Sequence, residues 1–246
     1  MPENPLIVAL DVSESEEAIR LCHQLKDKVK IFKIGLQLFL SGGQEIVQVV
    51  KSLGGEVFLD LKLCDIPNQV VGACRQIVGM GVKMFTLHTT GGFEMMKKAA
   101  EATRAEALKR KVPPPLMLGV TVLTSLDQSA LREWGIERGI IDQVVYLATL
   151  AKDAGLDGVV ASPQEISAIR KAIGPSTGGE GGRFLVVTPG VRPEWFASCD
   201  QRRVLTPAQA VQLGASYIVV GRPVIESTDP VEAVSKILEE IKGAIS

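Results

Sequence analysis

Short apolar runs alternate along this chain with longer stretches in which apolar residues recur every three or four positions. The short runs are typical of buried β-strands, and the longer stretches are typical of amphipathic helices. The apolar runs predict strands at residues 6–10, 31–34, 57–61, 84–88, 116–122, 158–161, 184–187 and 217–220. The stretches between them predict helices at residues 15–28, 44–53, 70–80, 93–111, 140–154, 163–173, 207–213 and 230–244.

This order of elements predicts an α/β fold made of parallel β/α units. Eight strands, each followed by a helix, favour a closed (β/α)8 TIM barrel. A doubly wound open sheet is the alternative, because the number of strands is a weak part of any assignment based on one sequence. The chain has no repeat beyond this alternation and no break in composition, so we expect one domain over residues 1–246.

Composition and charge narrow the class of protein. Of the 246 residues 46% are apolar, and 27 basic side chains balance 28 acidic ones. This balance argues against a nucleic-acid-binding surface and against a polybasic membrane anchor. We find neither a signal peptide nor an apolar run long enough to span a membrane. The four cysteines form no C-x-x-C pair, so we expect reduced thiols, a cytoplasmic location and no metal site.

Charged residues interrupt or end three of the predicted strands. Asp11 follows the first apolar run and Lys33 lies within the second. Asp60 and Lys62 lie at the end of the third, and Asp65 follows shortly after. Functional groups of a barrel lie at the carboxyl ends of its strands, so we expect this charged cluster at one rim. Side chains alternate across a strand, which places Asp60 and Lys62 on one face.

Two interpretations of the charged cluster are open. The structural one is that ion pairs close the end of the barrel. The functional one is favoured, because charges end three successive strands at the same rim. A lysine between two carboxylates keeps its proton, which does not suit a Schiff base but suits proton delivery to a developing carbanion. We therefore interpret Lys62 as a proton donor whose ammonium is held by Asp60 and Asp65.

Two segments after the last predicted strands suit an anion. TPGVRP at positions 188–193 follows the seventh strand and GRP at 221–223 follows the eighth, where barrels commonly bind phosphate. Glycine permits close backbone approach and arginine matches phosphate oxygens, so Arg192, Gly221 and Arg222 are candidate phosphate ligands. The segment 188–206 is long for a loop and is interpreted as a lid, with Gln201 closing over the anion. A plain turn is the alternative for GRP.

Two further polar positions follow strands at the same rim. Thr124 and Ser125 follow the fifth strand, where a hydroxyl could bond the edge of a heterocycle, although Ser125 and Asp127 also suit the start of a helix. His88 ends the fourth strand, and we interpret it as structural rather than catalytic.

The segment DLKLCDIPN at positions 60–68 resembles the signature of the orotidine 5'-phosphate decarboxylase family. The resemblance continues in order through Asp11, Lys33, GVTVLTS at 119–125, TPGVR at 188–192, DQRR at 200–203 and GRP at 221–223. The D-x-K-x-x-D core also occurs in sugar-phosphate enzymes of the same superfamily. Its combination with Lys33, Gln201 and the two arginines is more specific.

This resemblance implies a decarboxylation of orotidine 5'-phosphate to UMP without a cofactor or metal, the last step of de novo pyrimidine synthesis. Lys62 would protonate C6 of the ring, and Lys33, Asp60 and Asp65 would complete the charged cluster. The substrate would be held by Asp60, by Asp11 and Lys33 at the ribose hydroxyls, by Thr124 beside the pyrimidine, and by Arg192, Gln201, Gly221 and Arg222 at the phosphate.

The resemblance also implies a homodimer in which Asp65, Ile66 and Gln69 reach into the partner's site. Two positions depart from the family pattern. Cys64 stands where histidine is usual, outside the charged cluster. Gln69 stands where a threonine usually contacts ribose; glutamine still donates and accepts hydrogen bonds but is longer.

Two other functions are open. A metal-assisted aldolase or epimerase of the related barrels would use Asp60 as a magnesium ligand, and Lys33 would have no obvious role. A non-catalytic nucleotide-binding barrel would bind UMP without turnover, and it would not need a lysine between Asp60 and Asp65.

Overall fold

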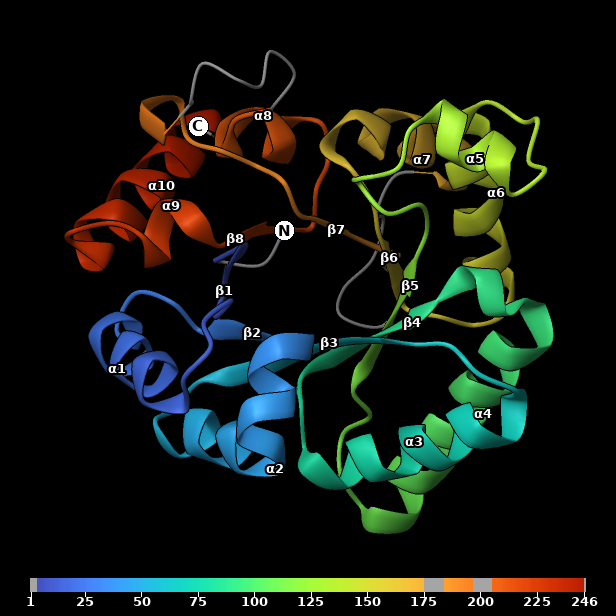
Figure 1. The fold of residues 1–246 in the computed structure, drawn as a ribbon, viewed down its shortest axis with the longest axis horizontal. Coiled ribbons are helices and arrows are strands. Elements are labelled where there is room, and N and C mark those ends of the chain that lie inside the picture. The colour runs from blue at the N-terminus through green and yellow to red at the C-terminus, as the bar shows by residue number, and fades with distance from the viewer. Residues whose placement is uncertain (1–3, 175–183, 197–204, 246) are drawn as a thin grey trace.

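Within residues 4–174, 184–196 and 205–245, which the computed structural model describes, eight parallel strands form a closed barrel (Figure 1). Each strand pairs with the next one in the chain, and β8 closes on β1. The strands are β1 (Leu6–Ala9), β2 (Ile31–Gly35), β3 (Glu56–Leu63), β4 (Met84–His88), β5 (Leu116–Val120), β6 (Gly158–Val160), β7 (Leu185–Thr188) and β8 (Tyr217–Val220). The prediction of a TIM barrel is confirmed, and the doubly wound alternative is wrong.

Helices surround this barrel, as Figure 1 shows. They are α1 (Ser15–Leu25), α2 (Leu36–Ser52), α3 (Pro67–Met80), α4 (Phe93–Arg110), α5 (Gln128–Glu133), α6 (Ile140–Asp153), α7 (Ile166–Ile173), α8 (Pro207–Gln212), α9 (Arg222–Ile225) and α10 (Pro230–Ile245). Their apolar faces pack on the outer side of the sheet through a buried layer that includes Leu21, Val47 and Ile77. Within the described ranges, no helix is both long enough and apolar enough to cross a membrane.

Three helices differ most from the sequence prediction, while the ends of several others shift by up to three residues. α2 begins at Leu36, well before the predicted start at residue 44, and it is interrupted at Gly43, where φ is 56°. The glycine pair at this interruption hides the first half of the helix from a search for regular periodicity. α5 and α9 were not predicted, because helices of 6 and 4 residues are too short to show a helical repeat. Asp127 caps α5 through a hydrogen bond from the Ala130 amide, which confirms that position as a helix start.

Alternating side chains fill the inside of the barrel. Ile7, Ile31, Phe58 and Met84 belong to a buried inner cluster that is separate from the layer under the helices. Successive strand residues point to opposite faces, so the residues two positions further along each strand also point inward. Continuing this alternation gives Asp11 just after β1, Lys33 on β2, Asp60 and Lys62 on β3, and Thr86 on β4. These polar side chains therefore lie above the apolar residues that fill the bottom of the barrel.

Strand pairing fixes the relative positions of these polar groups. Ala9 pairs with Lys33, and Gly35 pairs with Asp60. The pairing of β3 with β4 is irregular: Leu59 pairs with Phe85, but the next pair is Leu63 with Leu87. Four residues of β3 therefore span two residues of β4, and this bulge carries both Asp60 and Lys62.

Candidate active site

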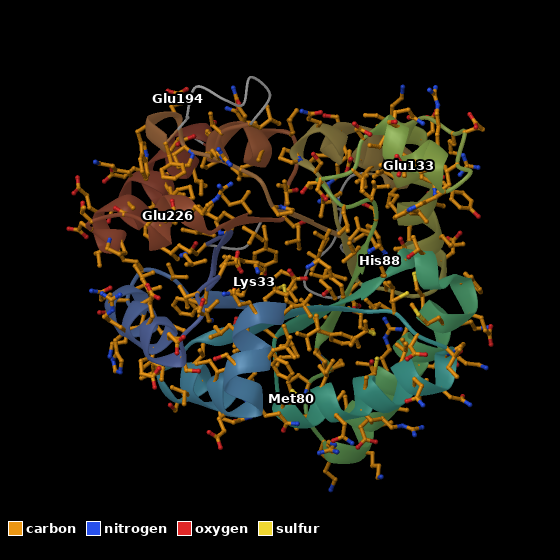
Figure 2. All side chains as sticks on the ribbon, viewed as in Figure 1. Lys33, Met80, His88, Glu133, Glu194 and Glu226 are labelled. Carbon is orange, nitrogen blue, oxygen red and sulfur yellow. The ribbon has the colours of Figure 1, made fainter. Side chains whose placement is uncertain are left out.

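The carboxyl ends of the strands open into a cavity of about 710 Å³. Cavities of this size are typical of small-molecule sites. Figure 2 shows Lys33 near the centre of the barrel, where this cavity begins. The structure brings eight of the candidates into its wall: Asp11, Lys33, Asp60, Lys62, Thr124, Arg192, Gly221 and Arg222.

Four side chains form a row of alternating charge, Asp11–Lys33–Asp60–Lys62, which we call the charged row. The Lys33 ammonium lies 2.8 Å from Asp11 Oδ1 and 3.7 Å from Asp60 Oδ2. The Lys62 ammonium lies 2.9 Å from the same Asp60 oxygen. Lys33 therefore sits between two carboxylates, and Asp60 sits between two ammonium groups.

Burial differs along the charged row. The side chains of Lys33 and Asp60 are only 11% and 13% exposed, whereas Lys62 is 31% exposed. Charges of this kind are tolerated when they are paired, and removal of one partner leaves an uncompensated charge that is strongly destabilising. The row is thus a fixed electrostatic field whose inner members position Lys62 at the open side of the cavity.

The backbone at Lys62 adopts an unusual conformation. Its φ is 52°, in the left-handed region that disfavours residues with a side chain. The residue lies within the bulge of β3, and its N–H donates a 2.9 Å hydrogen bond to Thr86 Oγ1 on β4 instead of pairing in the ladder. The conformation is therefore supported by a side chain of the neighbouring strand.

Thr86 is the most informative residue that the sequence analysis missed. It is fully buried, and its hydroxyl donates a 2.9 Å hydrogen bond to Asp60 Oδ1. The available signal was a single polar residue inside the apolar strand that begins at Met84. Gly35 was missed as well: a Cβ atom there would lie 3.1 Å from Lys33 Nζ, so the absence of a side chain leaves room for the ammonium.

Asp65 does not hold the Lys62 ammonium in the described part of this chain. No ion pair joins it to Lys62 in the described chain; its carboxylate is exposed and accepts a 2.6 Å hydrogen bond from the Ile66 amide. β3 ends at Leu63, so Asp65 lies just past the strand end, as the sequence predicted, but within the described chain it does not help to hold Lys62. Among the described residues of this chain, Asp60 is the carboxylate that forms an ion pair with Lys62.

The residues around Asp65 are exposed too. Ile66 is 65% exposed, and Cys64 and Gln69 also lie on the surface. None of the four lines the cavity of this chain in the part that the structure describes. A contribution of Asp65, Ile66 and Gln69 to a neighbouring subunit's site stays a prediction.

The phosphate candidates lie together. Pro189, Gly190 and Arg192 follow β7, Gly221 and Arg222 follow β8, and all of them line the cavity. The two loops meet the geometry that barrels commonly use for phosphate. The Gln201 prediction, and the central part of the expected lid at residues 197–204, lie outside the described residues.

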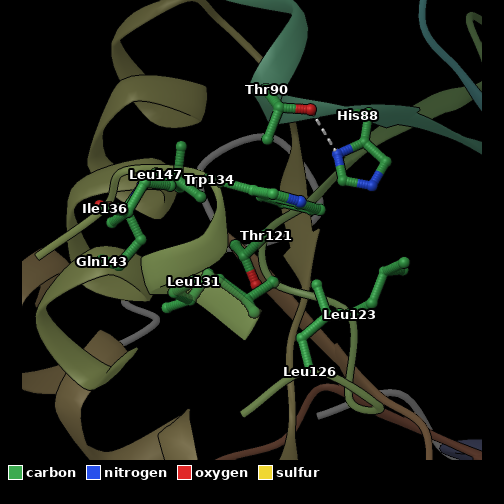
Figure 3. A pocket seen from close by; sticks show the side chains of 11 residues that line it. His88, Thr90, Thr121, Leu123, Leu126, Leu131, Trp134, Ile136, Gln143 and Leu147 are labelled. Carbon is green, nitrogen blue, oxygen red and sulfur yellow. Dashed lines mark hydrogen bonds between the residues drawn. The ribbon is translucent and has the colours of Figure 1, made fainter. Parts of the chain in front are cut away.

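His88 lies beside a smaller pocket of about 10 Å³ that adjoins the main cavity (Figure 3). Its Nδ1 and the Thr90 hydroxyl share a 2.9 Å hydrogen bond, which Figure 3 shows. Burial, followed by the nearby Lys62 ammonium, lowers the pKa of His88. Both effects favour the neutral ring, and the structural role of His88 stays a prediction.

Glu165 is a buried carboxyl in the cavity wall that the sequence analysis did not single out. Only 6% exposed, it accepts a 2.8 Å hydrogen bond from the Ser162 amide just after β6. Burial raises its pKa to about 7. Glu165 therefore keeps its proton to a higher pH than an ordinary glutamate does.

The sequence matches the family model described as "Orotidine 5'-phosphate decarboxylase / HUMPS family" over residues 4–237. Orotidine 5'-phosphate decarboxylase of Moorella thermoacetica is 49% identical over 98% of this chain and 93% of the relative. The enzyme of the same name from Syntrophotalea carbinolica is 47% identical over 98% of this chain and 96% of its own. The crystal structure of orotidine 5'-phosphate decarboxylase from Lactobacillus acidophilus superposes with a TM-score of 0.80 at 33% identity, covering 97% of this chain and 99% of that one. The charged row and the strand order that carries it therefore lie in a chain that belongs to the orotidine 5'-phosphate decarboxylase / HUMPS family.

Proposed function

We propose that this chain is an orotidine 5'-phosphate decarboxylase, a carboxy-lyase that forms UMP and CO2 in the last step of de novo pyrimidine synthesis. The charged row carries the proposal, because it sets two ammonium and two carboxylate groups in alternation at the wall of a cavity of about 710 Å³. In this proposal the reaction uses only side chains of the protein and needs no cofactor.

Lys62 is the proton donor in this mechanism. The bond between C6 of the pyrimidine and its carboxyl carbon breaks, CO2 leaves, and the electron pair stays on C6. The Lys62 ammonium stabilises this developing charge and then transfers a proton to C6, forming the new C–H bond. The resulting amine regains a proton from solvent, which the 31% exposure of the Lys62 side chain permits.

Asp60 serves the same step in two ways. It fixes the Lys62 ammonium at 2.9 Å and lies 3.7 Å from the Lys33 ammonium, so the proton donor has a defined position. Its negative charge also crowds the carboxylate of a bound substrate, which favours departure of CO2. The slow uncatalysed reaction demands stabilisation of this kind, since it produces a poorly stabilised carbanion.

The rest of the cavity wall binds the nucleotide. We assign the ribose hydroxyls to Asp11 and Lys33 and the pyrimidine edge to Thr124. The phosphate goes to Arg192, Gly221 and Arg222, with Gln201 as a further ligand. Binding energy from a phosphate remote from C6 can be used to order the charged row around the reacting carbon.

We further propose a homodimer in which Asp65, Ile66 and Gln69 enter the partner's site. Their exposure, and the 65% exposure of the apolar Ile66 side chain, support an interface at this segment. Asp65 from the second subunit would then supply the carboxylate that Lys62 lacks on its far side. Gln69, in place of the usual threonine, would reach further across the interface.

We also propose that residues 1–246 act as one decarboxylase domain in the cytoplasm. Cys22, Cys64 and Cys74 are free thiols in the described part of the chain, as a reducing compartment requires, while Cys199 lies outside that part.

The position of Asp60 favours this function over a metal-assisted aldolase or epimerase. A magnesium ligand needs an open carboxylate oxygen, but Asp60 Oδ2 faces two ammonium groups and Oδ1 accepts a hydrogen bond from Thr86. A non-catalytic nucleotide-binding barrel would gain nothing from the strained Lys62 backbone, which is a cost without a binding purpose.

The test is a spectrophotometric assay of the purified protein with orotidine 5'-phosphate in excess EDTA. We expect loss of substrate absorbance with stoichiometric CO2 release. Activity that disappears in chelator and returns with magnesium would favour the metal-assisted alternative, and UMP binding without turnover would favour the binding module.

A further inference from the structure

Thr86 lies beneath the charged row rather than in the cavity wall. It is on β4, two residues from Met84 of the inner cluster, and its side chain is fully buried. In the described structure it does not line the cavity, whereas Asp60 and Lys62 do. A ligand in the cavity would therefore meet Asp60 and Lys62 but not Thr86.

The Thr86 hydroxyl connects these two residues. It donates a hydrogen bond of 2.9 Å to Asp60 Oδ1 and accepts one of 2.9 Å from the Lys62 N–H. A hydroxyl has one proton to donate, and here Asp60 takes it. The bond to Asp60 leaves Oδ2 as the oxygen that faces Lys62 and Lys33. One side chain thus sets both the orientation of the carboxylate and the position of the lysine backbone.

The bond to Lys62 has a second consequence. Lys62 has a φ of 52°, which a residue with a side chain adopts only when its surroundings hold it there. Lys62 lies in the bulge between Leu59 and Leu63, where its N–H has no backbone carbonyl partner in the pairing with β4. The Thr86 hydroxyl oxygen takes the place of that carbonyl. Without that oxygen, a partly buried N–H would lose its partner and the backbone would relax toward the extended region.

We propose that Thr86 is a positioning residue for the Asp60–Lys62 pair. The inference rests on the proposed decarboxylation and deepens it, because it assigns the geometry of the proton donor to a hydroxyl that does not contact the substrate. Loss of the hydroxyl should lower kcat while leaving nucleotide binding close to normal, since the phosphate and ribose contacts lie elsewhere in the cavity.

The principal variant is Thr86→Val, which keeps the shape of the side chain and removes the hydroxyl. Thr86→Ser restores the hydroxyl. Thr103→Val is a matched control, because Thr103 is equally buried and its hydroxyl bonds the Ala99 carbonyl within α4, away from the cavity. For each protein the measurements are kcat and KM with orotidine 5'-phosphate, the Kd of UMP, and Tm.

We expect Thr86→Val to lower kcat roughly 10- to 100-fold, as loss of a supporting hydrogen bond typically does, with the Kd of UMP within about threefold of wild type. Thr86→Ser should recover most of kcat, and Thr103→Val should share any fall in Tm without the fall in kcat. If Thr86→Val does not fold, Thr86→Ala measured against Thr86→Ser isolates the same hydroxyl.

Near-normal kcat in Thr86→Val, or an equal loss in Thr86→Ser, would overturn the inference. So would a loss of kcat in Thr103→Val as large as that in Thr86→Val, because it would show a general effect of stability. The wild-type assay separates the two proposals: a wild type without turnover overturns the proposed function, whereas an active wild type with an equally active Thr86→Val overturns this inference only.

Discussion

The Lys62 ammonium folds back onto Asp60, two residues earlier on the same strand, and lies 2.9 Å from its Oδ2. Side chains two apart on a regular strand share a face but lie well separated along it. The left-handed backbone at Lys62 and the bulge of β3 change that spacing, so the proposed proton donor and its carboxylate come from one short segment. In the described part of the chain, Lys33 and Thr86 supply further polar contacts to the pair.

Removal of the lysine amine tests the chemical role most directly. Lys62→Ala should lower kcat at least about 100-fold, because general acid catalysis contributes on that scale or more. UMP binding should remain measurable by calorimetry, since the proposed phosphate contacts are intact. Lys98→Ala removes an exposed lysine paired with Glu94 on α4 and should leave kcat unchanged. Near-normal turnover in Lys62→Ala would refute the role of proton donor.

Arg222 tests the phosphate end of the cavity. Arg222→Ala should raise KM for orotidine 5'-phosphate roughly 10- to 100-fold, as expected for one charged hydrogen-bonding group of about 1.5–3 kcal/mol. The same variant should have far less effect on phosphate-free orotidine. Arg20→Ala, which removes an exposed arginine of α1, is the control. Equal losses with both substrates would argue against a phosphate contact.

A single methyl group at position 35 tests the packing of the charged row. The Cβ of Gly35→Ala would lie 3.1 Å from Lys33 Nζ and 3.4 Å from Asp11 Oδ1, so the ammonium must shift by a few tenths of an ångström. We expect kcat/KM to fall about 10-fold, since small misplacements of positioned groups are costly. Gly243→Ala, at a glycine of α10 with open space around it, should leave the rate unchanged. Wild-type kinetics in Gly35→Ala would show that the row tolerates displacement.

We predict that Glu165 makes the free energy of unfolding depend on pH. Its pKa is about 7 in the folded protein against 4.5 for an ordinary glutamate, so between these values the folded state holds a proton that the unfolded state has lost. The contribution of Glu165 to the free energy of unfolding is therefore fully present below about pH 4.5 and is lost as pH rises through 7. The total loss is about 3 kcal/mol.

Urea unfolding between pH 5 and 8 measures this effect. Glu165→Gln keeps an acceptor for the Ser162 amide and removes the titrating carboxyl. The free energy of unfolding of this variant, relative to that of wild type, should therefore increase as pH rises. Glu137→Gln changes a carboxylate that is 83% exposed, so its free energy of unfolding should depend on pH in the same way as that of wild type. Parallel curves for Glu165→Gln and wild type would contradict the assignment.

The barrel could be predicted because strands alternate with helices along the chain. Most of the charged row could be predicted because side chains alternate between the two faces of each strand. Ile31 and Lys33 share a face of β2 as Phe58 and Asp60 share one of β3, and the chain alone shows this. The sequence could not show whether Asp65 reaches Lys62 within one chain, because the bulge at Lys62 is revealed only by the pairing of β3 with β4. Thr86 was missed for a related reason: its partners lie 24 and 26 positions away in the sequence.

The side chains of the charged row come from three neighbouring strands, so their relative positions depend on the register of those strands. A slip of β2 by one residue would turn Lys33 toward the helices and bring Phe32 or Ile34 inward. A molecule with β2 out of register in this way would keep its helical content and much of its compactness. Its charged row, however, would not form. Turnover per mole of protein therefore reports the fraction of molecules with correctly aligned strands, which circular dichroism cannot distinguish.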